Sequence, residues 1–100
     1  MPALLIADIE VTDAAGYEEY QRRVPAYLAA YDGRFIVRAG STRTLEGAWQ
    51  AHRVVIIEFP SMDRLLAFYD SAEFATLKSL RMHAADCRII ASSRRQETPT

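Results

Sequence analysis

The stretch Arg53-Val-Val-Ile-Ile-Glu-Phe59 decides the fold, because it is the clearest β-strand pattern in the chain. Successive side chains of a strand point to opposite faces of its sheet. When helices cover only one face, the second face is normally polar. Here both faces are apolar, with Val55, Ile57 and Phe59 on one and Val54 and Ile56 on the other. The sequence therefore predicts a strand that needs cover on both sides.

Three further strand patterns and two helical regions surround this stretch. The predicted strands span residues 4–11, 34–40 and 87–92. The first predicted helix follows Thr12-Asp13 and the second follows Pro60-Ser61. The second helical region breaks at Asp70-Ser71 and resumes over residues 72–84. Asp and Ser cap helices because their side chains accept from the free amides of the first turn. With short connections and right-handed crossovers, the order β-α-β-β-α-β predicts an α+β, ferredoxin-like subunit. Its four-stranded antiparallel sheet would carry the helices on one face.

The first helix contains a break in its pattern. Aromatic and apolar residues from Tyr17 to Tyr31 recur at three- and four-residue steps, which is typical of a helix. Pro25 lies inside this stretch, and proline removes a backbone donor, so we expect a kink or a restart there. Residues 41–51 have no firm period and are expected to form a loop. Residues 1–93 are predicted to be a single domain, followed by a frayed polar tail over 94–100.

The sheet face away from the helices predicts a partner. It would present Leu4, Ile6, Val54, Ile56 and either Ile89 or Ile90. At roughly 25 cal/mol per Å² of apolar surface, leaving this patch in water forfeits several kcal/mol. A second copy, packed sheet against sheet about a twofold axis, is the simplest cover. The alternatives are cover by the tail or by the 41–51 loop, but both are polar. We therefore expect a homodimer through the open face of the sheet.

Composition excludes several classes of partner and site. The chain has 100 residues, with 12 Lys and Arg against 13 Asp and Glu, which gives no reason to expect nucleic acid or an anionic membrane as a partner. One Cys excludes an internal disulfide. Two His without a matching cluster of acids or thiols make a poor metal site, so neither a metal nor a cofactor is expected. The first residues lack the basic region of a signal peptide, so a cytoplasmic protein is expected.

Three arginines are the candidate ligand-binding residues. Arg38, Arg53 and Arg81 could hold an acidic or enolic ligand, because a guanidinium binds a carboxylate with two parallel hydrogen bonds. Arg38 has the strand parity of Ile36 and is expected to share a face with Arg34. Arg81 would point inward if Phe74 does, and it could instead cap the first helix. Aromatic residues, Tyr20 and Tyr69 among them, either line a pocket or belong to the core.

Three residues are candidates for moving a proton. They are Glu46, Glu58 and His83. Regular alternation places Glu58 and Arg53 on opposite faces of their strand. The competing explanation for the Arg and Glu residues is a cross-strand ion pair that fixes the strand register. For His83 the competing explanation is an exposed side chain at a helix end, where a cation is mildly favoured.

Several motifs together resemble a known family. They are Tyr17-x-x-Tyr20, Tyr31-Asp-Gly33-Arg34, Leu45-Glu46-Gly47, Glu58-Phe59-Pro60-Ser61, Phe68-Tyr69-Asp-Ser71-Ala-Glu-Phe74 and Arg81. In this order they resemble the uncharacterised family of the domain of unknown function 1330, which belongs to the dimeric α/β-barrel superfamily. The resemblance implies a ferredoxin-like subunit and a homodimer, but no known activity. Relatives in that superfamily include cofactor-free monooxygenases, lactone isomerases, haem enzymes and stress-response proteins. The chain departs from the family pattern where Asp32-Gly33 replaces a Gly-Gly pair and where Phe74 replaces a frequent Tyr.

These observations leave two function classes open. The first is a small-molecule-binding homodimer, including a cofactor-free enzyme of the monooxygenase or isomerase type that acts on a small organic or acidic ligand. The second is a non-catalytic dimeric module for regulation or interaction. Whether the protein is an enzyme is left open. A pocket between sheet and helices with convergent polar groups favours the first class, and a solid core favours the second.

Overall fold

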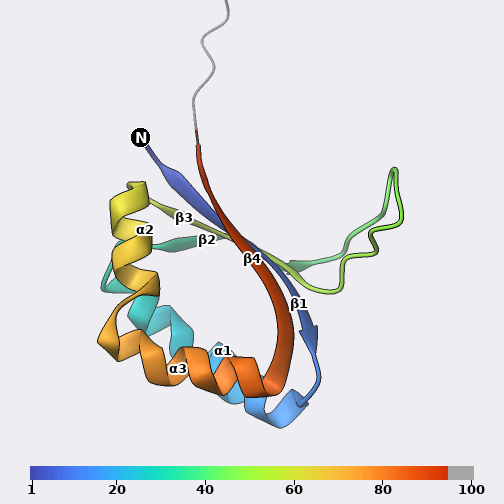
Figure 1. The fold of residues 1–100 in the computed structure, drawn as a ribbon, viewed down its shortest axis with the longest axis horizontal. Coiled ribbons are helices and arrows are strands. Elements are labelled where there is room, and N and C mark those ends of the chain that lie inside the picture. The colour runs from blue at the N-terminus through green and yellow to red at the C-terminus, as the bar shows by residue number, and fades with distance from the viewer. Residues whose placement is uncertain (95–100) are drawn as a thin grey trace, which may run out of the picture.

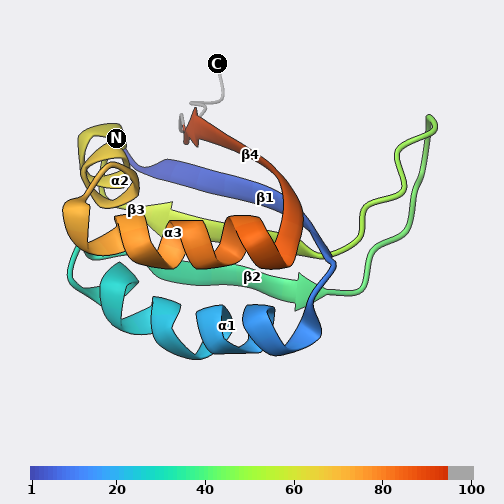
Figure 2. The ribbon, with the colours of Figure 1, turned by 60° about the horizontal axis from the view of Figure 1, so that its bottom comes forward.

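The computed structural model describes residues 1–94. It contains β1 (Ala3–Val11), α1 (Ala14–Ala29), β2 (Arg34–Gly40), β3 (Val54–Phe59), α2 (Met62–Tyr69), α3 (Ala72–Ala84) and β4 (Ala85–Ser93). The four strands form one sheet in the order β2-β3-β1-β4, and every neighbouring pair is antiparallel. All helices lie on one face of this sheet (Figures 1 and 2). The ferredoxin-like α+β architecture is thereby confirmed, with the second helical region divided into α2 and α3.

Capping residues set where each helix begins. The Asp13 side chain accepts from the Gly16 amide at 3.3 Å, and the Ser61 and Ser71 hydroxyls accept from the amides three residues later at 3.1 and 3.2 Å. Each cap satisfies a donor that the first helical turn leaves free. A restart at Pro25 is not observed, because α1 runs without interruption through it.

The core lies between the sheet and the helices. Alternate residues of β1 and β3 point into it, including Leu5, Ile9 and Ile57, all of which are buried. From the helices, the Phe68 ring packs against Phe59 and Phe74 with centroids 5.4 and 4.4 Å apart. This alternation follows from the two-residue period of a strand.

The opposite face of the sheet is apolar and carries no helix. Leu4, Ile6, Val54 and Ile56 are partly exposed on it, and Ile90 is 63% exposed. The register places Ile90 opposite Ile6, so Ile90 rather than Ile89 belongs to this face. The described residues place no helix over this patch. The predicted tail over 94–100 lies, apart from Arg94, outside the described residues.

The connection between β2 and β3 forms an arm over residues 41–53, which is exposed from residue 41 to residue 50. It stands away from the sheet (Figure 1). Asp8 of β1 holds its base, since the carboxylate accepts from the Trp49 indole N–H and the His52 amide, each at 2.9 Å. Leu45 near the tip is 88% exposed. Trp49 at the base of the arm borders the apolar face beside Ile6 and Ile90. The rest of the arm extends away from the sheet, so it does not cover this face as the alternative prediction required. In the part of the chain that is described, no helix meets the length and apolarity needed to span a membrane.

Candidate functional site

A cavity of about 40 Å³ lies between the sheet and the helices. Its wall is mostly apolar, with Leu5, Ile9 and Val55 from the sheet and Phe74 from α3 among its residues. Three arginines predicted to bind a ligand reach this cavity from different elements: Arg38 from β2, Arg53 just before β3, and Arg81 from α3. Tyr20 and Tyr69 also line it. The structure therefore brings together all five predicted substrate-binding residues.

Arg81 is the most buried of the three arginines. Phe74, Leu77, Arg81 and Ala84 follow one another at helical spacing and all are buried, so Arg81 lies on the inner face of α3. Its side chain is only 5% exposed, and its Nε has no hydrogen-bond partner. Burial lowers the pKa of Arg81, but the neighbouring phenols of Tyr20 and Tyr69 outweigh it and the net pKa lies above the ordinary value. Arg81 is therefore a buried, charged group with an unused donor.

Arg38 reaches the cavity because β2 is irregular. The β2–β3 register shifts between Phe35 and Val37 and again between Arg38 and Gly40, which leaves one extra residue at each place. The second extra residue, Ala39, has a φ of 59°, a left-handed conformation that is rare for a residue with a Cβ. A bulge changes the direction of the side chains beside it. The prediction that Arg38 shares a face with Arg34 is therefore wrong, since Arg38 pairs with Val55 on the helix side.

A proline in α1 supplies a partner for Arg38. Pro25 has no N–H, so the Gln21 carbonyl one turn earlier lacks its helical donor. The Arg38 Nη2 donates to that carbonyl oxygen at 3.1 Å. The Arg38 guanidinium also lies over the Phe35 ring, 4.4 Å from its centroid. Together these contacts hold Arg38 at the side of the cavity.

Arg53 and two tyrosines complete the polar part of the wall. The Arg53 guanidinium lies 5.1 Å from the centroid of the Tyr17 ring, and the Tyr17 and Tyr20 rings are 5.6 Å apart. Burial raises the pKa of both phenols, an effect that Arg53 opposes at Tyr17 and Arg81 opposes at Tyr20. Both phenols therefore stay protonated at neutral pH and can donate a hydrogen bond. Tyr17 and Gln21 were missed as site residues, although Tyr17 lies one helical turn before Tyr20.

The three residues predicted to move a proton do not line the cavity. Glu46 lies in the exposed arm. His83 is exposed on α3, and its Nδ1 lies 2.8 Å from the Ser79 carbonyl oxygen. Glu58 is buried on the opposite face of the sheet, where it pairs with Leu4 and Arg34. The structure thus separates these residues from the arginines.

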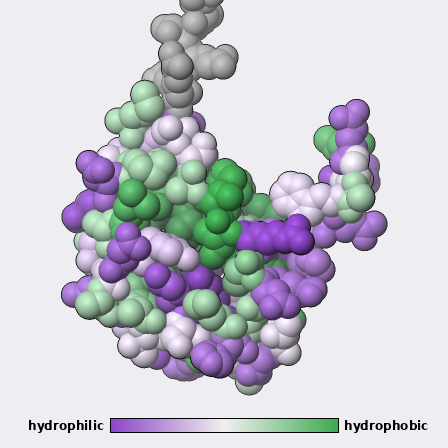
Figure 3. Space-filling model, in the orientation of Figure 1, coloured by the Kyte–Doolittle hydropathy of each residue, from purple (hydrophilic) through white to green (hydrophobic). Residues whose placement is uncertain are grey.

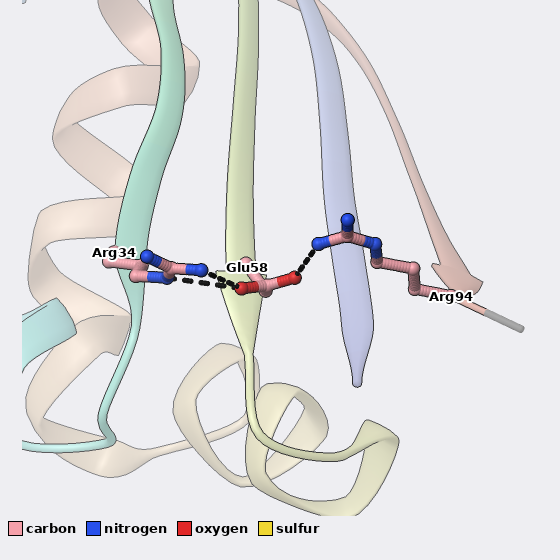
Figure 4. A network of polar contacts seen from close by, with 3 residues as sticks. All are labelled: Arg34, Glu58 and Arg94. Carbon is pink, nitrogen blue, oxygen red and sulfur yellow. Dashed lines mark hydrogen bonds and ion pairs between the residues drawn. The ribbon is translucent and has the colours of Figure 1, made fainter. Parts of the chain in front are cut away.

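Glu58 belongs to a cross-strand ion-pair network. The Glu58 Oε1 accepts from the Arg34 Nε at 3.0 Å and from its Nη2 at 2.5 Å, and its Oε2 accepts from Arg94. Figure 4 shows the two guanidinium groups approaching Glu58 from opposite sides, that of Arg94 across β1. The hydrogen bonds from Arg34, and then those from Arg94, lower the pKa of Glu58. This is the register-fixing pair that was the alternative explanation for Glu58.

The cavity wall is positively charged. No Asp or Glu side chain stands among its residues, as far as the described part of the chain shows. Residues 1–94 also contain no group of three His, Cys, Asp or Glu side chains that could hold a metal ion. Three guanidiniums with protonated phenols beside them can bind an anion or stabilise one that forms during a reaction.

Comparison with known proteins gives a family and a fold. The family model described as a domain of unknown function, DUF1330, matches residues 2–93. No curated protein matches the chain.

Solved structures of three proteins are similar to the whole chain. A protein of unknown function from Rhodopseudomonas palustris has a TM-score of 0.76 and 18% identity, with 96% of this chain and 84% of that chain covered. SnoaB from Streptomyces nogalater, described as a cofactor-independent oxygenase, has a TM-score of 0.67 and 16% identity, with 99% and 98% covered. HapK from Hahella chejuensis has a TM-score of 0.65 and 19% identity, with 98% and 97% covered. At these identities the likeness shows the fold alone.

Proposed function

Because the chain belongs to the DUF1330 family of domains of unknown function, the family assigns it no activity. From its cavity we propose that it forms a homodimer that binds a small organic ligand whose polar group lies between the sheet and the helices. The convergence of Arg38, Arg53 and Arg81 on a mostly apolar cavity carries this proposal. Ligand sites are apolar hollows in which a few placed polar groups fix the ligand. A non-catalytic interaction module would have no use for three arginines around an internal space.

The homodimer rests on the open face of the sheet. Leu4, Ile6, Val54 and Ile56 are partly exposed there and Ile90 is 63% exposed, and no described helix lies over them. Contiguous apolar patches on a protein surface commonly mark interaction sites. A twofold interface would use the same patch on both subunits. Ligand and partner would then occupy opposite faces of one sheet.

Binding is a better-supported function than catalysis. Neither a carboxylate nor a His stands in the cavity wall within residues 1–94, so a phenol is the proton-carrying group beside Arg81. The second candidate is a cofactor-free enzyme, in which the arginines stabilise a developing anion. The likeness to SnoaB, described as a cofactor-independent oxygenase, supports this candidate. In that case Tyr20 rather than Glu46, Glu58 or His83 would exchange the proton.

A ligand screen tests the binding proposal. Thermal unfolding of the wild type is measured with a library of small organic acids, enols and neutral compounds. The matched variants are Arg81→Met in the cavity and Arg22→Met on the exposed surface of α1. We expect compounds that raise the melting temperature of the wild type and of Arg22→Met but not of Arg81→Met. A library without any hit on the wild type would refute the proposal.

A further inference from the structure

Arg81 separates the cavity from a second space. Outside the cavity lies a recess of about 380 Å³ between α3 and β4, lined by Tyr69, Arg81, Cys87 and Ile89 among others. Tyr69, Arg81 and Ile89 belong to the walls of both spaces. Figure 3 shows apolar side chains on the surface between α2 and β4, and more polar ones toward α3. The Arg81 guanidinium thus stands where an inner space meets an outer one.

The donors of the three arginines are not equally free. Arg38 donates to the Gln21 carbonyl, and the Arg53 guanidinium lies over the Tyr17 ring. Arg81 is 5% exposed and its Nε has no partner. Leaving a buried charged donor unpaired is costly, and buried polar groups normally have a protein, water or ligand partner. The open position in this site is therefore the Nε of Arg81.

The structure assigns to this position a monoanionic organic ligand, whose carboxylate or enolate oxygen accepts from Arg81 and whose organic part occupies the outer recess. This inference rests on the proposed function and names its substrate class. The sizes of the two spaces support it. About 40 Å³ admits a water molecule or the oxygen atoms of a head group, whereas about 380 Å³ admits a ring.

The charges around Arg81 favour one negative charge on the ligand and no more. The phenol groups of Tyr20 and Tyr69 lie beside the guanidinium, and burial raises the pKa of Tyr20, so that phenol carries no charge. The Cys87 thiol has its pKa raised by burial, with Arg81 opposing the rise, so it is also neutral. Asp86 lies on the wall of the recess and is the one carboxylate that residues 1–94 contribute to that lining. A second negative group on the ligand would meet Asp86, and like charges repel.

Calorimetric titration with matched aromatic probes tests the inference. The probes are benzoate as a monoanion, benzamide as its neutral isostere and isophthalate as a dianion. We expect the wild type to bind benzoate at least tenfold more tightly than benzamide and isophthalate. That preference should disappear in Arg81→Met and persist in Arg22→Met. Asp86→Asn should reduce the difference in affinity between benzoate and isophthalate.

The outcomes separate this inference from the proposed function. Equal affinity of the wild type for benzoate and benzamide would overturn the anion assignment, and this comparison needs no folded variant. A preference for benzoate that survives in Arg81→Met would overturn Arg81 as its cause. If neutral library compounds stabilise the wild type but not Arg81→Met, the result would support the proposed ligand binding and contradict the assignment of an anionic ligand. Absence of binding by all three probes would overturn the anion assignment, and absence of any library hit would overturn both.

Discussion

Replacement of Arg81 by methionine should stabilise the fold while it removes anion binding. A buried donor without a partner costs about 1–3 kcal/mol, and the Arg81 Nε is such a donor. Methionine is unbranched and flexible, so it fills the same space without a polar atom. The variant loses the contacts of the guanidinium with the Tyr20 and Phe74 rings, whose centroids lie 5.7 and 6.0 Å away. At a desolvated site such contacts stabilise by about 2 kcal/mol. Because the cost of an unpaired donor lies at or above the upper end of its range for a charged group, the net gain in unfolding free energy is about 1 kcal/mol.

Urea and thermal unfolding at one fixed protomer concentration measure this gain. For a domain of this size, about 1 kcal/mol raises the melting temperature by about 4–8 °C. Arg22→Met is the control, because Arg22 is exposed and a surface substitution changes stability by about 0.5 kcal/mol or less. A loss of about 1 kcal/mol or more in Arg81→Met, with Arg22→Met unchanged, would refute the reasoning. It would mean that the guanidinium already has the partners it needs.

Three further perturbations test the interface, the β2 geometry and the ion-pair network. Ile56→Asp places a charge on the open apolar face and should halve the mass measured by light scattering. The control Leu66→Asp on α2 should leave the mass unchanged, and an Ile56→Asp variant with the mass of the wild type would show that this face is not the interface. Pro25→Ala restores a helical donor that competes with Arg38, so benzoate affinity should fall by about threefold to tenfold while stability rises; unchanged affinity would show that Arg38 needs no such partner. Because the pKa of Glu58 is lowered in the folded protein, its stabilisation is present above the ordinary value of 4.5 and is lost as pH falls through the lowered pKa. The Glu58→Gln variant should therefore be less stable than the wild type at neutral pH, and its urea midpoint should change less with pH below 4.5. If the urea midpoints of the two proteins changed with pH in parallel, the result would contradict the network.

Helix and strand periodicity predicted much of the site. The spacing of Phe74 and Arg81 placed both on the inner face of α3, and the structure agrees. Alternation along β3 placed Arg53 and Glu58 on opposite faces, and Arg53 does line the cavity while Glu58 does not. These predictions succeed because both elements are regular, so that residue number alone fixes side-chain direction.

Alternation failed at Arg38, where the strand is irregular. Extra residues in β2 change the face on which later side chains lie, and Ala39 shows no sign of this in the sequence because left-handed backbone is normally the place of glycine. The continuity of α1 was missed for a related reason. The carbonyl that Pro25 leaves free is satisfied by a residue of another element, Arg38, which no local pattern contains. The second failure arises from a tertiary contact between α1 and β2.

The outer part of the arm, residues 41–48, is a place where the chain can be altered without touching either face of the sheet. Both of the arm's hydrogen bonds to Asp8 are made close to β3, by Trp49 and His52, while residues 41–48 are exposed throughout. A peptide tag or a reporter domain inserted beside Leu45 would hang in solvent, since exposed loop tips accept insertions and nicks best. The position is equally suited to new termini for a circularly permuted version of this protein.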